Sequence, residues 1–241
     1  MTHPSAPVGW SLAGTVASTA ASAPAATLDL ATPAAGLEPA GLGRGIRLLG
    51  VDLRGPCGPL ERWIRGADLI AVYEPDDPRR LRATALWRPW LAPTGVAAWE
   101  LLLSAQTALV SSDSALAVVS EAVATEAAWG ESTPAGWRWT RAEPGQPRPA
   151  RATSVLVRAG HGADARPSLL VAVHPDDVRH IDIDRAGDLL RVRCWLFSTA
   201  IEKGQLFRSR VLAAVGPARD DEAWAGGLGS AFAAAPPPLT T

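Results

Sequence analysis

The stretch LRATALWR, from Leu81 to Arg88, decides the class of fold. Leu, Ala, Ala and Trp at its odd-numbered positions alternate with Arg, Thr, Leu and Arg at its even-numbered positions. A two-residue period of this kind is typical of a β-strand with one face on a core and the other in water. The segment from Val96 to Thr107 repeats it, with Trp99 and Leu101 on the apolar side and Glu100 on the polar side. Both segments are therefore predicted strands of an antiparallel sheet.

Nine further segments have strand character, and turn sequences rich in Gly, Pro and Asp separate them. The chain holds 22 Gly and 21 Pro, which supply the turns that many short strands need. We therefore predict an all-β fold, an antiparallel β-sandwich of many short strands. The further segments are Thr27–Leu30, Arg47–Leu53, Asp68–Tyr73, Trp137–Thr140, Ser154–Arg158, Leu169–Val173, Val178–Asp184, Leu189–Phe197 and Gln205–Val215.

One short helix is predicted near the C-terminus, from Asp220 to Ala234. Asp220 and Asp221 suit the positive end of the helix macrodipole, and Pro236 to Pro238 end the helix. Three glycines at positions 226, 227 and 229 lower its intrinsic helix propensity. Packing against the rest of the protein must therefore hold this helix in place.

Two segments leave the organisation of the chain open. Ser114 to Trp129 fits either a helix capped by Asp113 or a strand with an adjoining loop. The Pro-rich segment 141–151 is the only linker-like stretch, and it divides the chain into two parts with no visible repeat. We predict one β-sandwich domain over residues 1–241, with 141–151 as the alternative point of division.

Charge and hydropathy exclude several classes of protein. Lys and Arg number 23 against 24 Asp and Glu, so the basic excess that a dedicated nucleic-acid binder needs is missing. No apolar run reaches the ~18 residues of a transmembrane helix. Residues 1–28 lack the positive charge of a secretory signal. We expect a cytoplasmic protein without a nucleic-acid or membrane partner.

The two cysteines, Cys57 and Cys194, are too few for a disulfide framework or a usual structural zinc site. We expect two free thiols, with one bridge between them as the alternative. The Gly-x-Ser-x-Gly elbow, the Walker-type phosphate loop and the His-Glu-x-x-His zinc motif are all absent. The sequence therefore predicts no metal and no cofactor.

Histidine and aspartate concentrate between residues 174 and 188. These residue types at close spacing can form an acid–base pair or ligate a metal. His174, His180 and Asp182 are the candidate catalytic residues on this interpretation. Their number in one short segment is the reason to consider an enzyme at all.

An antiparallel hairpin explains the same residues without catalysis. With a four-residue loop at 185–188, Asp182 lies opposite Arg191 and His180 opposite Arg193. Opposite charges across a strand pair stabilise an ordinary solvated sheet face. We favour this interpretation.

The next strand carries Arg208 and Arg210 and fits two registers. Paired directly with the preceding strand, both arginines lie on the apolar face, opposite Cys194 and Val192. A bulge at Gly204 instead returns both to the wet face, where they join the other arginines and could bind an anionic sugar or a carboxylate.

Tryptophan is unusually common, with ten Trp against three Phe and one Tyr. Several indoles stand beside arginines, a combination suited to stacking on sugar rings while the guanidinium holds hydroxyl or carboxylate groups. Trp90 and Trp137, with Arg88 and Arg138, are the candidate ligand-binding residues because they lie near turns. The alternative is that Trp fills a core otherwise rich in Ala.

Three functions follow from these observations. The first is a non-catalytic, carbohydrate-binding β-sandwich, the second a sugar-acting enzyme, and the third an assembly or scaffolding protein with a protein partner. In its general character the chain resembles carbohydrate-binding sandwiches and mutarotase-like sugar enzymes, a likeness of fold that does not fix function. We favour the first, with a saccharide as ligand.

Overall fold

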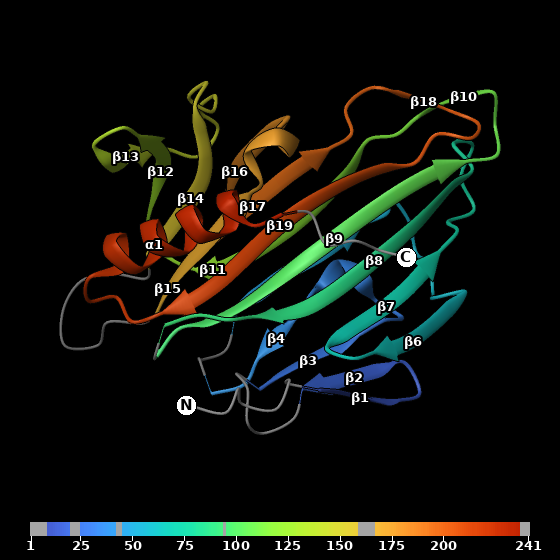
Figure 1. The fold of residues 1–241 in the computed structure, drawn as a ribbon, viewed down its shortest axis with the longest axis horizontal. Coiled ribbons are helices and arrows are strands. Elements are labelled where there is room, and N and C mark those ends of the chain that lie inside the picture. The colour runs from blue at the N-terminus through green and yellow to red at the C-terminus, as the bar shows by residue number, and fades with distance from the viewer. Residues whose placement is uncertain (1–8, 20–24, 42–44, 94, 159–166, 237–241) are drawn as a thin grey trace.

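A computed structural model describes residues 9–19, 25–41, 45–93, 95–158 and 167–236 (Figure 1). Over these ranges the protein consists of antiparallel β-sheets with one α-helix, α1 (Asp221–Ala234), at the C-terminal end. The predicted all-β class and the C-terminal helix are confirmed. Within the same ranges, no helix is long and apolar enough to cross a membrane. Of the segment 1–28 assessed for a signal sequence, residues 1–8 and 20–24 lie outside this description, as do Pro237 and Pro238.

The largest sheet has nine strands, and every neighbouring pair is antiparallel. The two segments with the clearest alternation, now β8 and β9, lie side by side near its middle. In spatial order the strands are β13 (Gly136–Ala142), β12 (Glu126–Thr133), β14 (Ala152–Arg158), β15 (Ser168–Val173), β19 (Phe207–Gly216), β9 (Ala97–Thr107), β8 (Leu81–Trp90), β7 (Asp68–Tyr73) and β6 (Glu61–Arg65).

Smaller sheets pack against the inner face of this large sheet. The second sheet contains β16 (His180–Ala186), β17 (Leu189–Leu196), β11 (Leu116–Val123) and β5 (Arg47–Asp52). An N-terminal sheet contains β1 (Trp10–Ala13), β2 (Val16–Thr19), β3 (Ala26–Asp29) and β4 (Glu38–Pro39). A two-stranded ribbon joins β10 (Ser111–Asp113) to β18 (Ala200–Glu202), and short 3₁₀ helices span Pro33–Ala35 and Pro175–Asp177.

The main core lies between the large sheet and the smaller ones. Trp87 and Trp99, on the apolar sides of β8 and β9, are fully buried there. Hydrogen bonds cross the core between layers: the Trp87 indole N–H donates to the carbonyl of Leu49 at 3.1 Å, and the Tyr73 hydroxyl to that of Leu30 at 3.2 Å. Several tryptophans therefore fill the core, as the alternative interpretation predicts.

The helix α1 covers part of the outer face of the large sheet (Figure 1). Its Ala225, Leu228 and Phe232 are buried against a small apolar cluster on β9, β14, β15 and β19. Gly226 and Gly229 face the Trp137 ring of β13 so closely that a Cβ would lie within 3.0 Å of it. The glycines that weaken the helix therefore allow this close packing.

The segment Ser114–Trp129 is strand, not helix, and forms β11 and the first half of β12. Ala127, Ala128 and Trp129 are all buried because β12 has the main core on one side and α1 with its cluster on the other. Burial on both faces removes the alternation that identifies a strand. The helical alternative is therefore wrong.

The hairpin β16–β17 has a two-residue turn at 187–188, not the predicted four-residue loop. The glycine that opens this turn has φ of 64°, which suits a two-residue connection. Asp182 consequently lies opposite Arg193 and His180 opposite Trp195, each two positions from the predicted partner. A shift of two residues keeps every side chain on its predicted face.

Both predicted registers for the strand carrying Arg208 and Arg210 are wrong. After β17 the chain crosses to the large sheet, where β19 pairs with β9 and β15. Arg210 is buried on the outer face of that sheet, and Arg208 is exposed on the same face. The combined basic face with the arginines of β17 does not form.

Both cysteines are free thiols, as expected. Cys194 is fully buried, and this burial raises the pKa of its thiol to about 12. Cys57 is partly exposed.

Candidate functional site

A hollow of about 170 Å³ lies on the outer face of the large sheet, where β8, β9 and β19 run side by side. The strand register places Thr84, Ser104 and Arg208 in one row across the three strands. Arg82 and Gln106 form the next row. Leu86, Leu102 and Leu206 complete the lining. The polar positions of the alternation in β8 and β9 therefore converge on one concave surface with an apolar floor.

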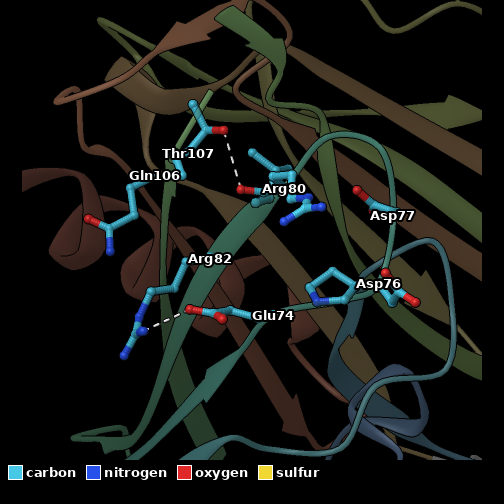
Figure 2. Close-up of a pocket in the computed structure, with 10 residues that line it drawn as sticks. Glu74, Asp76, Asp77, Arg80, Arg82, Gln106 and Thr107 are labelled. Carbon is cyan, nitrogen blue, oxygen red and sulfur yellow. Dashed lines mark hydrogen bonds and ion pairs between the residues drawn. The ribbon is translucent and has the colours of Figure 1, made fainter. Parts of the chain in front are cut away.

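A second hollow of about 470 Å³ adjoins the first, around the loop between β7 and β8 (Figure 2). Arg82 and Gln106 line both hollows. Arg82 donates to Glu74 at 2.7 Å, and the Thr107 hydroxyl donates to the carbonyl of Arg80 at 3.3 Å, as Figure 2 shows. The outer-face site is defined here as Arg80, Arg82, Ser104, Gln106 and Arg208.

The three arginines of the outer-face site differ in how far they are neutralised. Arg82 donates to two carboxylates, those of Glu74 and Glu61, the second at 2.8 Å. Burial acts to lower the pKa of Arg82, but the bonds to these carboxylates outweigh it and raise that pKa. In the part of the chain that the structure describes, Arg208 reaches only the Ser104 hydroxyl, at 3.4 Å. Within the described residues, the Arg80 side chain has no partner. Two guanidinium groups are therefore free to hold a negatively charged group.

A buried polar cluster lies one row closer to α1. Arg210 donates to Glu100 at 2.7 Å, and its guanidinium carbon lies 4.9 Å from the centre of the Phe232 ring. The Nε2 atom of His174 is buried and has no hydrogen-bond partner among the described residues, and the imidazole packs edge-on against Phe232 at 5.6 Å. Burial raises the pKa of Asp177, which accepts the backbone N–H of Arg210 at 2.9 Å. The end of α1 therefore covers groups with acid–base chemistry.

The predicted sugar-stacking residues Trp90 and Trp137 both contact α1. Trp90 meets Phe232 edge-on, with ring centres 5.7 Å apart. Trp137 stacks on Trp139 at 5.6 Å and donates from its indole N–H to the Ser230 hydroxyl at 2.8 Å. Both rings are half-buried, because a helix from the far end of the chain packs on them.

The two arginines chosen with these tryptophans are held by acids. Arg88 forms a bidentate pair with Asp68, with both bonds at 2.8 Å. Arg138 donates to the buried carboxylate of Glu131. Arg88 lies on β8 and Arg138 on β13, at separate positions of the large sheet. The structure therefore does not gather the four predicted ligand-binding residues into one site.

One concave surface does remain beside Trp137. A hollow of about 360 Å³ is bounded by Trp137, Trp139 and the glycine face of α1. The Trp139 indole N–H is buried, and no described residue accepts a hydrogen bond from it. Trp137 thus keeps a place beside a surface that a ligand can reach.

The candidate catalytic residues do not form one cluster. His174 belongs to the covered cluster, with Nδ1 3.8 Å from the exposed carboxylate of Asp176. His180 Nε2 lies 2.5 Å from Asp182, whose other oxygen accepts the Trp195 indole N–H at 2.6 Å. In the part of the chain that the structure describes, no group of three or more His, Cys, Asp or Glu could hold a metal ion.

The aspartates of β16 instead belong to a charge-paired sheet face. Arg193 donates to Asp184 at 3.3 Å, and Arg191 donates to Glu121 on the neighbouring strand at 3.1 Å. This arrangement matches the favoured sequence interpretation in kind, with the partners changed by the two-residue shift.

Sequence reasoning missed Arg80, Arg82, Ser104 and Gln106 as site residues. The signal was present, since Ser104 and Gln106 occupy the polar positions of the alternation in β9. Strand order was the missing information, because only the pairing of β9 with both β8 and β19 brings these side chains together with Arg208.

No protein-family model matches this chain, and no curated protein matches it. Among solved structures, it is similar to one described as "Crystal Structure Analysis of HI1317". The two are 6% identical, with a TM-score of 0.46, and the match covers 83% of this chain and 91% of the other.

Proposed function

We propose that the protein binds a saccharide that carries an anionic group, at the outer-face site. One observation carries this proposal: side chains with hydrogen-bonding groups from three adjacent strands line one hollow together with leucines. Among the described residues, Arg208 of this hollow and the neighbouring loop residue Arg80 have no carboxylate partner. We also predict a cytoplasmic location and no nucleic-acid partner, from charge and composition alone.

The chemistry of the lining suits such a ligand. Leu206, which is 54% exposed, presents methyl groups against which the C–H face of a sugar ring can pack, beside the buried Leu86 and Leu102. Ser104 and Gln106 offer both donors and acceptors for ring hydroxyls. Arg208 offers a planar fork that matches a carboxylate or phosphate in a bidentate way.

A sugar-acting enzyme is the second candidate, favoured by the unpartnered Nε2 of His174. An acid–base catalyst must reach its substrate, and Phe232 packs against this imidazole. Turnover of the sugar in the binding experiment below, followed by NMR, would favour this candidate over simple binding.

Calorimetric titration with glucose, glucuronate and glucose 6-phosphate tests the proposal. We expect the acidic sugars to bind more tightly than glucose, with an affinity that falls as salt is raised. Arg208→Ala should weaken acidic-sugar binding at least about tenfold, since a hydrogen bond to a charged group contributes roughly 1.5–3 kcal/mol.

Two variants serve as controls. Arg141→Ala removes the same charge from a side chain that is 83% exposed on β13, and it should leave the affinity unchanged. Trp137→Ala separates this site from the hollow beside α1. If none of the sugars binds, or if Trp137→Ala abolishes binding while Arg208→Ala does not, the proposal fails.

A further inference from the structure

Among the residues that the structure describes, β6 is an edge strand of the large sheet, and only β1 of the N-terminal sheet lies beside it, where the Arg62 side chain donates to the carbonyl of Gly14 at 2.8 Å. The strand β6 stands last in the strand order, pairs with β7 alone, and forms the border of the sheet in Figure 1. All five of its side chains are exposed, including Trp63 and Ile64, and Leu60 just before it is 57% exposed. Soluble proteins usually protect such edges, because the free backbone groups invite pairing with another strand.

The sequence of β6, ERWIR, is complementary to itself when two copies run antiparallel about Trp63. In that register Trp63 lies opposite Trp63 of the second copy, and Glu61 lies opposite Arg65 of the second copy. These three residues share the outer face of the sheet, because they pair with Val72, Ile70 and Asp68 of β7. Opposite charges and paired aromatic rings across neighbouring strands both stabilise a sheet.

The charges around this pairing also alternate in sign. Within one copy Glu61 binds Arg82 at 2.8 Å, and Arg65 lies 3.9 Å from Asp68. Both Glu61 and Arg65 remain about half exposed, at 55% and 50%, so each can meet a second opposite charge. Pairing two copies therefore extends each ion pair into a row of arginine, glutamate, arginine and aspartate.

The opposite edge of the sheet does not have this property. The strand β13 carries Arg138 and Arg141 and no acidic residue. Its Trp137 and Trp139 pack beside α1 rather than standing free. Two copies meeting at β13 would bring like charges together, so the self-complementary edge is β6.

We propose that the protein forms a two-fold symmetric dimer by antiparallel pairing of β6 with β6 of a second copy. The large sheets of the two copies then run on as one, and Trp63 sits at the two-fold axis. The test of this dimer does not depend on the proposed saccharide site, because assembly is measured without ligand.

Sedimentation velocity and light scattering test the dimer by charge reversal. The wild-type protein should have twice the 25.1 kDa chain mass. Glu61→Arg and Arg65→Glu each place like charges opposite one another and should halve the measured mass. An equal mixture of the two variants should regain the dimer mass, because every 61–65 pair across the two-fold is then again an arginine with a glutamate.

Arg141→Glu is the matched control, since it reverses one exposed charge on β13 and should leave the mass at the dimer value. Circular dichroism of each variant separates loss of assembly from loss of fold, and the mixture rescues only variants that fold. A wild-type protein that stays monomeric across the micromolar range, or single variants that stay dimeric, would overturn the proposal.

Discussion

The guanidinium of Arg210 on β19 donates through Nε to Oε1 of Glu100 on β9 at 2.7 Å, and the two side chains are 4% and 1% exposed. Arg210 also donates to the carbonyl of Ala235, just after α1, at 2.9 Å. The buried ion pair therefore links the middle of the large sheet to the end of the helix that covers it.

Removing one member of this pair should be costly. Arg210→Met leaves the carboxylate of Glu100 buried without its partner, and we expect a loss of about 3–5 kcal/mol in the free energy of unfolding. The double variant Arg210→Met with Glu100→Leu should recover most of that loss, because no charge is left buried. Urea denaturation of Arg210→Met, Glu100→Leu and the double variant gives the interaction free energy between the two side chains.

The exposed pair between Arg141 and Glu143 provides the comparison. Arg141→Met should lower the free energy of unfolding by at most about 1 kcal/mol, since exposed ion pairs contribute little. If Arg210→Met lowers the free energy of unfolding by no more than this, the buried pair is not a link between sheet and helix.

Two glycines of α1 should respond in opposite directions to the same substitution. Gly229→Ala places a Cβ 2.5 Å from Cζ2 of Trp137, so the ring or the helix must move and the protein should be destabilised. Gly227→Ala meets nothing within 4 Å and should stabilise the protein by about 0.5–1 kcal/mol through helix propensity. Thermal unfolding of the two variants measures both effects.

Each variant in that pair controls the other, because residue type, helix and position within the helix are nearly the same. The sign of the difference carries the conclusion. Equal stabilisation by both substitutions would mean that Trp137 does not pack against the helix as the structure has it.

Strands with one wet face were predictable from sequence, and strands covered on both faces were not. The alternation is visible in β8 because its even-numbered side chains lie on a part of the outer face that the helix does not cover. In β12 the residues Ala127 and Ala128 are both buried, so no period is visible. The strand β6 gave no signal for the opposite reason, since all of its side chains are exposed.

The candidate site depended on contacts that sequence patterns do not contain. Local alternation correctly assigned polar faces, but the partner strands of β19 are set by a chain crossing between sheets. The expected exposure of Trp137 depended on α1, which begins at Asp221, more than eighty residues further along the chain. Strand order and helix docking are long-range properties: strand order defines the outer-face site, and helix docking defines the surroundings of Trp137.

Acid should weaken the anchor at the start of α1. Asp221 accepts hydrogen bonds from Arg158 at 2.7 and 3.0 Å and from the Ser168 hydroxyl at 2.7 Å. Burial alone would raise the pKa of Asp221, but the bonds from Arg158 and Ser168 outweigh it and hold that pKa below its usual value. A carboxyl whose pKa is lowered by folding stabilises the fold above its unfolded pKa of about 3.9, and this contribution is lost as pH falls through the folded pKa.

We therefore expect Asp221→Asn to lower the free energy of unfolding by roughly 1.5–3 kcal/mol at pH 7. Between pH 4 and pH 2 the free energy of unfolding of this variant should fall less steeply than that of the wild type, as urea denaturation at several pH values would measure. Ser168→Ala removes one of the three bonds and should give an intermediate slope, whereas an Asp221→Asn protein with the wild-type acid slope would show that this carboxylate does not anchor the helix.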